Sequence, residues 1–137
     1  MKKLLIAAII FAAFSMPCQA ATRQDVQSVL DKVYAVYPGW VDSYEYGVWD
    51  CSEMSQYLYD TFRSKGFAAK YCNSQRLWHC WVEVYPAPYA AIWWTVEATT
   101  LTIVDDTKWY YSEDVQRNRA MKRREVDYWN SPFMRKT

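Results

Sequence analysis

Apolar residues recur with helical spacing near the start of the chain. After residue 20, positions i, i+3, i+4, i+7 and i+8 are apolar, a spacing that places side chains on one face of a helix. These positions are Val26, Val29, Leu30, Val33 and Tyr34. Thr22 and Asp25 resemble a capping box, and Pro38 follows the pattern. We therefore predict an amphipathic helix from about Thr22 to a point before Pro38.

A second helical pattern covers residues 51 to 65 and stops at Gly66. Its apolar face consists of Met54, Tyr57, Leu58, Thr61 and Phe62. Asp50 and Ser52 are typical of a helix start, so we expect the first turn of this helix to hold Cys51. Residues 40 to 50 have no sustained period and predict a loop, whose aromatic residues could form one wall of a groove: Trp40, Tyr44, Tyr46 and Trp49.

Strand patterns follow Gly66. Residues 67 to 72 and 78 to 85 read as two strands joined by a polar hairpin, and residues 92 to 98 and 101 to 104 as two more. In the second strand, alternation puts His79 and Trp81 on one face and Cys80 and Val82 on the other.

The last part of the chain predicts another helix. Ser112-Glu113-Asp114 is a favourable N-cap for a helix through about Arg124, whose basic residues suit its C-terminal end. An anionic cell-surface or peptide-binding patch is the alternative interpretation of these basic residues. The order of elements predicts an α+β fold, in which N-terminal helices pack on a small antiparallel sheet and a C-terminal helix follows.

The N-terminal 20 residues have the pattern of a secretory signal peptide. Lys2 and Lys3 precede an apolar run, and Cys18-Gln19-Ala20 is a small-residue cleavage site. The run is about 11 residues long, too short for a membrane span of roughly 20. An uncleaved anchor and lipidation at Cys18 are less favoured alternatives. We expect a secreted or periplasmic protein in which residues 21 to 137 form a single domain.

Composition adds two exclusions. Without Lys2 and Lys3, the chain has 14 basic residues (16 less these two) against 15 acidic ones, a net charge of about −1 with its histidine neutral. This charge gives no reason to expect a nucleic-acid partner. After the signal, no stretch is long and apolar enough for a stable membrane span.

Three cysteines remain after the signal, and an odd number in an exported chain leaves one thiol free or bridged to another molecule. Cys72 and Cys80 flank the predicted hairpin, so a Cys72–Cys80 disulfide is the economical assignment and leaves Cys51 free. A bridge from Cys51 to either of the other two is the alternative.

A free thiol at a helix N-terminus is placed where the helix dipole lowers the pKa of a cysteine. The one histidine, His79, could act as its base, and Glu97 on the neighbouring predicted strand could orient the imidazole. A zinc site built from Cys51, Cys72, Cys80 and His79 is disfavoured, because His79 and Cys80 point to opposite faces and no Cys-x-x-Cys pair occurs. We therefore expect no metal and no cofactor.

Three short blocks resemble the motifs of the transglutaminase-like cysteine-protease superfamily. They are Trp49-Asp50-Cys51-Ser52-Glu53-Met54-Ser55, His79-Cys80-Trp81-Val82-Glu83-Val84 and Trp94-Thr95-Val96-Glu97-Ala98-Thr99-Thr100. The similarity is greatest to small microbial domains of this kind, and residues 126 to 131 resemble their aromatic tail. The resemblance implies a papain-like core with Cys51 as nucleophile, His79 as base and Glu97 as orienting acid.

The implied chemistry is acyl transfer on a peptide, protein or cell-wall amide, by hydrolysis or transamidation. The Cys51 N–H would stabilise the oxyanion, with Trp49 or Tyr46 as candidate second groups. The chain departs from the superfamily in having Glu97 where most members have Asp, and in a short Cys-to-His spacing. A degenerate domain that binds peptides or cell-wall ligands without turnover is the alternative, followed by a non-enzymatic structural or partner-binding protein.

Overall fold

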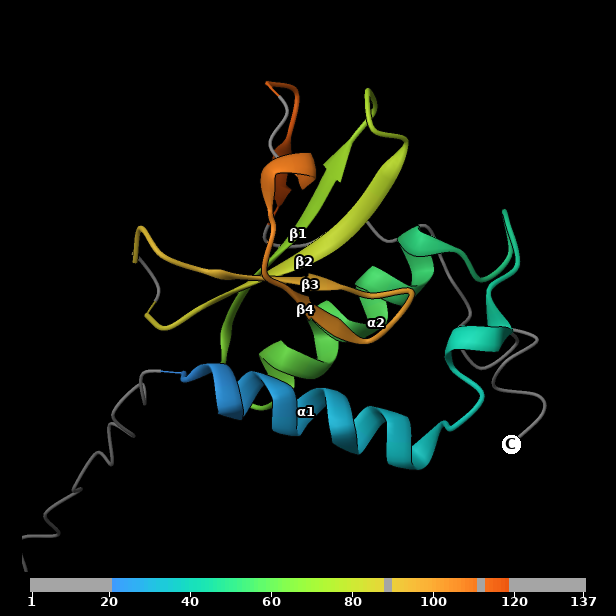
Figure 1. Ribbon diagram of the computed structural model, residues 1–137, viewed down its shortest axis with the longest axis horizontal. Helices are drawn as coiled ribbons and strands as arrows, with labels where there is room; N and C mark the ends of the chain where they lie inside the picture. Colours follow the sequence, from blue (N-terminus) through green and yellow to red (C-terminus); the bar gives the residue numbers. More distant parts are fainter. Residues whose placement is uncertain (1–20, 88–89, 111–112, 119–137) are drawn as a thin grey trace, which may run out of the picture.

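The computed structural model describes residues 21–87, 90–110 and 113–118. The predicted signal peptide and aromatic tail lie outside the described residues. The described chain forms the elements in the order α1, α2, β1, β2, β3, β4 and β5, with short 3-10 helices in two loops. This arrangement confirms the α+β class (Figure 1).

Both helices begin where the sequence predicts, because each has a capping box. Helix α1 is Arg23–Val36, and the Thr22 side chain caps it by accepting a hydrogen bond from the Asp25 N–H. Helix α2 is Cys51–Ser64, and Asp50 caps it in partnership with Glu53. Capping satisfies backbone N–H groups that a helix start leaves without intrahelical partners. The cap of α2 therefore fixes Cys51 as the first helical residue.

The strands form one antiparallel sheet in the order β4-β3-β2-β1-β5. Their bounds are Ala68–Ser74 for β1, His79–Tyr85 for β2, Trp94–Glu97 for β3, Thr102–Val104 for β4 and Gln116–Asn118 for β5. Strand β2 lies at the centre, pairing with β1 on one side and β3 on the other. The central strand thus carries His79 at its first residue.

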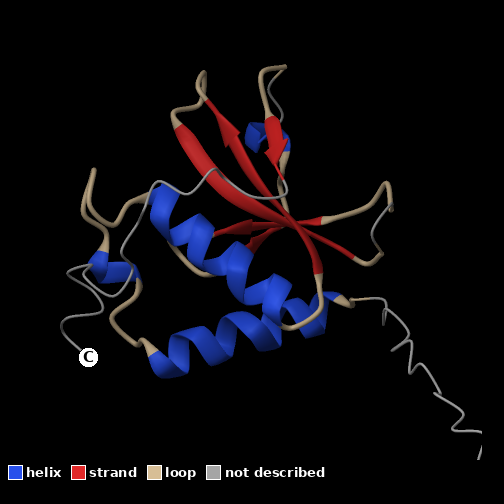
Figure 2. Ribbon diagram, turned by 180° about the vertical axis from the view of Figure 1, so that it is seen from behind, coloured by secondary structure: helices blue, strands red, loops and turns tan. Residues whose placement is uncertain are grey.

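Helix α2 packs across one face of the sheet, over β1 and β2, and α1 lies beneath it (Figure 2). This face is the core side: β-strand residues such as Val82, Val84 and Val96 are fully buried against apolar residues of the two helices. Burial of such side chains is the main favourable contribution to folding, at roughly 25 cal/mol per Å² of apolar surface. The same packing holds the N-terminus of α2 beside the start of β2.

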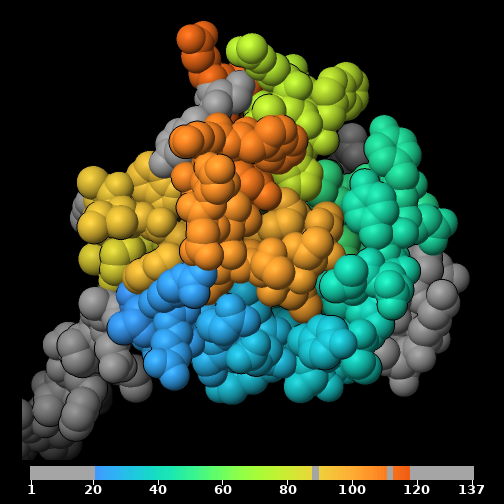
Figure 3. All heavy atoms as spheres, in the orientation of Figure 1, coloured from blue at the N-terminus to red at the C-terminus, as the bar shows by residue number. Residues whose placement is uncertain are grey.

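The opposite face of the sheet is covered by the segment that follows β4. Its 3-10 helix, Lys108–Tyr110, places Tyr110 against Trp81, with ring centroids 5.3 Å apart. In the space-filling view this segment occupies the centre of the visible face, above α1 (Figure 3). Trp81 and Glu83 are consequently buried although they point away from the core.

The predicted C-terminal helix is wrong over its described part. Residues 113 and 114 are in a turn, and residues 116 to 118 form β5, which pairs with Tyr71–Asn73 of β1. Tertiary contacts explain the difference. Arg117 Nε lies 2.8 Å from Oε2 of the buried Glu83, and Asp114 accepts hydrogen bonds from the Ser74 hydroxyl and the Arg76 N–H. These contacts override a helical preference that is local and weak. The rest of that prediction, residues 119 to 124, lies outside the described residues.

Candidate active site

Cys51 occupies the first turn of α2, above a loop that is tied to the helix start. One carboxylate oxygen of Asp50 accepts a hydrogen bond from the Gly47 N–H and the other from the Ser52 N–H, each at 2.9 Å. Gly47 has a φ of +73°, a conformation that suits glycine. No described residue accepts a hydrogen bond from the Cys51 N–H. That N–H is therefore available to an anionic oxygen beside the thiol.

The two acids of the cap have different protonation behaviour. Glu53 is buried, and its burial next to Asp50 raises its pKa to about 7. Burial also opposes charge on Asp50, but hydrogen bonds from Glu53, Ser52 and Gly47 outweigh it and lower the Asp50 pKa. Asp50 is thus ionised at neutral pH, whereas the Glu53 carboxyl stays protonated up to about pH 7.

His79 and Glu97 lie side by side on the face away from α2. The Nε2 atom of His79 is 2.6 Å from Oε2 of Glu97, and both side chains are largely buried. The antiparallel pairing of β2 with β3 and their shared face produce this contact. The additional methylene of Glu compared with Asp does not prevent it.

Glu97 is held by three further hydrogen bonds. Its Oε1 accepts from the Thr99 N–H at 3.1 Å and from the Thr99 hydroxyl at 2.8 Å, and its Oε2 accepts from the Tyr110 hydroxyl at 2.8 Å. Burial alone would raise the pKa of Glu97, yet the His79 contact and the Thr99 hydrogen bonds lower it. Glu97 is therefore a fixed carboxylate that can orient the imidazole through Nε2 and leave Nδ1 for a second partner.

Aromatic rings enclose the imidazole of His79. The Trp81 ring stacks on it at 6.2 Å between centroids, and Trp109 lies edge-on at 5.3 Å. Sequence reasoning missed Trp109 and Tyr110, since they stand in a segment without periodicity and their only signal was the high aromatic content. Together the rings limit the positions that His79 can adopt.

Cys51 and His79 line the same two surface pockets. The hairpin-side pocket, about 510 Å³, also contains Tyr46, Tyr71 and Cys80 in its wall. The loop-side pocket, about 430 Å³, is bounded by residues that include Val41, Tyr44 and Thr99. Trp78, whose residue is 86% exposed, borders both. The thiol and the imidazole are therefore reachable from solvent at the junction of two pockets.

The loop aromatics divide between this surface and the core. Tyr44 and Tyr46 are exposed at the pockets, as a groove wall requires. Trp40 and Trp49 are fully buried instead, with ring centroids 5.5 Å apart. The structure places the Trp49 side chain in the core, so it does not bring this candidate oxyanion group to the pockets.

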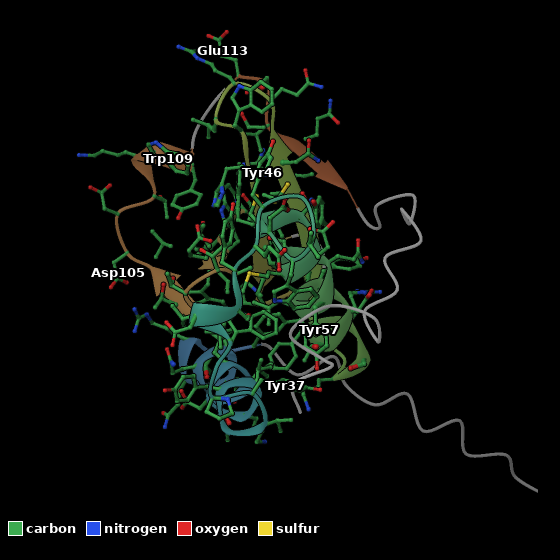
Figure 4. The ribbon with its side chains drawn as sticks, turned by 90° about the vertical axis from the view of Figure 1, so that its right-hand side faces the viewer. Tyr37, Tyr46, Tyr57, Asp105, Trp109 and Glu113 are labelled. Atoms are coloured by element: carbon green, nitrogen blue, oxygen red, sulfur yellow. The ribbon has the colours of Figure 1, made fainter. Side chains whose placement is uncertain are left out.

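A related cluster supports the loop from below. Tyr37 and Tyr57 lie edge to face near the end of α1, with centroids 6.0 Å apart (Figure 4). Trp40 packs on Tyr57 at 5.3 Å and donates a hydrogen bond from its indole N–H to the Ala98 carbonyl. This packing connects the loop ahead of Cys51 to the strand that carries Glu97.

The described cysteines are all free, so the expected Cys72–Cys80 disulfide is absent. The strand register explains why. Cys72 is directly opposite Trp81, whereas Cys80 is opposite Asn73, which places the two thiols on opposite faces of the sheet. Cys72 is buried on the Glu83 side. Cys80 is on the core side, where it meets the start of α2.

Cys80 lies beside Cys51 and interacts with it. The sulfur of Cys80 is 3.8 Å from the Ser52 hydroxyl, and each of the two thiols changes the pKa of the other. This interaction lowers the pKa of Cys80 to about 6, against the effect of burial and with help from the Tyr71 and Ser52 hydroxyls. The same interaction and burial raise the pKa of Cys51. Cys80 is therefore the thiol of the pair that ionises first.

Two further observations bear on the class of protein. In the described part of the chain, no group of three or more His, Cys, Asp or Glu side chains could hold a metal ion, and no helix is long and apolar enough to cross a membrane.

Comparison with protein families, with curated proteins and with solved structures gave no match.

Proposed function

We propose that this protein is an exported, thiol-dependent acyl-transfer enzyme that acts on carboxamides through Cys51, His79 and Glu97. One observation carries the proposal: a thiol at a helix N-terminus and a carboxylate-bound imidazole line the same two pockets. A nucleophile, a base and a group that orients the base are the parts that covalent acyl transfer requires.

The first step is attack on the amide. The Cys51 thiol loses its proton to Cys80 or His79, and the N-terminus of α2 stabilises the resulting thiolate. A carbon–sulfur bond forms, and the π electrons of the carbonyl move to its oxygen. The free Cys51 N–H faces this developing charge as a hydrogen-bond donor.

The second step releases the amine. His79 donates a proton to the leaving nitrogen as the carbon–nitrogen bond breaks, which leaves a thioester on Cys51. Glu97 keeps the imidazole oriented through Nε2. Water or a substrate amine then attacks the thioester, so that the net reaction is hydrolysis or transamidation of a peptide, protein or cell-wall amide.

The resemblance to the transglutaminase-like superfamily supports these assignments. Its three blocks supply Cys51 from a helix start and His79 and Glu97 from adjacent strands, in the order Cys, His, acid. A papain-like arrangement, with the nucleophile's helix packed on an antiparallel sheet, is part of the proposal. The substrate is less transferable than the fold and the triad.

The test is iodoacetamide labelling of the fully reduced protein from about pH 4 to about pH 9, with each cysteine followed by peptide mapping. Cys80, whose pKa is lowered to about 6, should react below about pH 7 in any case. Cys51, whose pKa is raised beside Cys80, should be alkylated in this range only because His79 accepts its proton. His79→Ala should abolish this labelling of Cys51. Cys72 is the internal control, because it is buried and its pKa is raised by burial and by Glu83.

A second arm measures acyl transfer to the thiol. The reduced protein is incubated with p-nitrophenyl acetate, and peptide mapping locates the acetyl group on Cys51 or Cys80. Acetylation that depends on His79 supports the enzyme. Labelling of Cys51 that appears only near pH 8.5, together with no acetylation, would overturn the proposal in favour of a domain that binds peptides or cell-wall ligands without turnover.

A further inference from the structure

The geometry points to a second use of the pocket: we propose that Cys51 and Cys80 form a reversible disulfide that closes the nucleophile to substrate. Both thiols are partly exposed and line the hairpin-side pocket. The effect on activity rests on the proposed function, whereas the disulfide itself does not. Exported proteins meet oxidising conditions in which such bonds persist.

The fold determines which two cysteines can join. Cys51 is the first residue of α2 and Cys80 the second residue of β2, and these elements pack directly against each other. Ser52, the residue after Cys51, has its hydroxyl 3.8 Å from the Cys80 sulfur. Cys72 is excluded, because it points to the other face of the sheet and is buried there.

The chemistry at Cys80 favours exchange with an external disulfide. Its lowered pKa supplies a thiolate near neutral pH, and the neighbouring Cys51 is in position to resolve the adduct. Three groups face Cys80 from the elements around it: the Cys51 thiol and Ser52 hydroxyl from α2, and the Tyr71 hydroxyl from β1, with His79 adjacent on β2. Each of them stabilises the Cys80 anion.

The reaction balances with a low-molecular-weight disulfide such as oxidised glutathione as the oxidant. The Cys80 thiolate attacks one glutathione sulfur, which forms a mixed disulfide and releases one glutathione thiolate. Cys51, after losing its proton, attacks the Cys80 sulfur and releases the second glutathione thiolate. The protein loses two electrons and two protons, and oxidised glutathione becomes two molecules of reduced glutathione.

The experiment treats the full chain with oxidised glutathione and then maps disulfide-linked peptides by mass spectrometry, with and without dithiothreitol. We expect a Cys51–Cys80 peptide pair that dithiothreitol removes, with loss of at least tenfold in Cys51 alkylation rate while it is present. Cys72→Ser is the matched control and should form the same pair. In Cys80→Ser, Cys51 should instead retain glutathione as a mixed disulfide.

Three outcomes separate this inference from the proposed function. Linked Cys51–Cys80 peptides without His79-dependent acetylation support the disulfide and contradict the enzyme. His79-dependent acetylation without linked peptides supports the enzyme and contradicts the disulfide. Wild-type protein that yields mixed glutathione adducts alone, or a bridge to Cys72, overturns the inference.

Discussion

The imidazole Nε2 of His79 lies 2.6 Å from Oε2 of Glu97, on the face of the sheet opposite the helix that carries Cys51. His79 belongs to the end of its strand, where the pockets reach it, while Glu97 is held from the far side by Thr99 and Tyr110. The carboxylate is thus held by hydrogen bonds, and the imidazole, although enclosed by aromatic rings, still borders the pockets. An orienting group of this kind affects the chemistry without touching the substrate.

Removing the charge of Glu97 should slow the chemistry at Cys51. In Glu97→Gln, the imidazole loses a charged partner of lowered pKa, and we expect His79-dependent acetylation of Cys51 to fall about a hundredfold or more. Tyr110→Phe is the control, because it removes one hydrogen bond and leaves the carboxylate, and its effect should stay within about threefold. Equal rates in wild type and Glu97→Gln would remove Glu97 from the site.

Glu53 should make stability fall as the pH rises toward neutrality. Its pKa is about 7 in the folded protein and 4.5 ordinarily, so the stabilisation is complete below about pH 4.5 and is lost as the pH rises through about 7. We expect Glu53 to contribute a decrease of about 2 kcal/mol in the free energy of unfolding between about pH 5 and about pH 8. The lowered pKa of Cys80 acts in the opposite sense in the same interval, so the contribution is read as the difference between wild type and Glu53→Gln. Urea unfolding at several pH values measures it.

Glu53→Gln provides the comparison, because it keeps a hydrogen-bonding side chain in the cap without an ionisable group. Its stability, compared with that of wild type, should lack the Glu53 decrease across the same interval. Glu97 acts in the opposite sense: its folded pKa is lowered, so its contribution is lost as the pH falls, below the window in which Glu53 is measured. Parallel profiles for wild type and Glu53→Gln would contradict the role of Glu53.

The backbone conformation of Trp78 should lower the stability of the folded protein. Its φ is +50°, a left-handed conformation disfavoured for residues with a Cβ by about 1 kcal/mol, and its exposed indole is little buried. Trp78→Gly should therefore be more stable than Trp78→Ala by about 1 kcal/mol in urea unfolding. Equal stability of the two variants would show that the turn is not strained in solution.

The Arg117–Glu83 pair should be needed for stability. Glu83 has 2% of its side chain exposed, and Arg117→Ala would leave its carboxylate buried beside Tyr85 without its ion-pair partner. We expect a loss of about 2 to 3 kcal/mol in the free energy of unfolding, because Lys70, opposite Glu83 in the strand register, only partly replaces the lost charge. Glu83→Gln in the same chain should restore part of this loss.

The exposed ion pair between Arg23 and Asp105 is the control for the stability lost in Arg117→Ala. Its two side chains are 53% and 83% exposed. Arg23→Ala should cost less than about 1 kcal/mol. Similar losses of stability in Arg23→Ala and Arg117→Ala would contradict the claim that the burial of Glu83 makes the Arg117–Glu83 pair stabilising.

The sequence predicted those elements whose signals are local. Thr22 and Asp50 mark the helix starts because capping depends on residues within three positions. Strand alternation placed His79 and Glu97 on equivalent faces, since the period of a strand is two. The contact between them then required only that the strands pair as antiparallel neighbours.

The remaining features depend on contacts between distant positions. Residues 116 to 118 are a strand because Arg117 reaches Glu83, which local propensity does not report. Tyr110 bonds to Glu97 from a segment without a pattern, and Trp49 is drawn into the core by Trp40. The sequence did not predict the proximity of Cys51 and Cys80, because the hairpin suggested a Cys72–Cys80 disulfide. The strand register instead places Cys72 and Cys80 on opposite faces of the sheet.

The short outer strands affect how this protein behaves at high concentration. Both β4 and β5 have three residues, and β5 covers only part of β1. Within the described chain, residues 68 to 70 and Ser74 of β1 are not paired with β5, and the Lys70 ammonium lies over the Tyr85 ring. Another molecule adding a strand there would have to desolvate that charge. The sheet is therefore protected against edge-to-edge aggregation, and Lys70→Val should make the protein more prone to form fibrils.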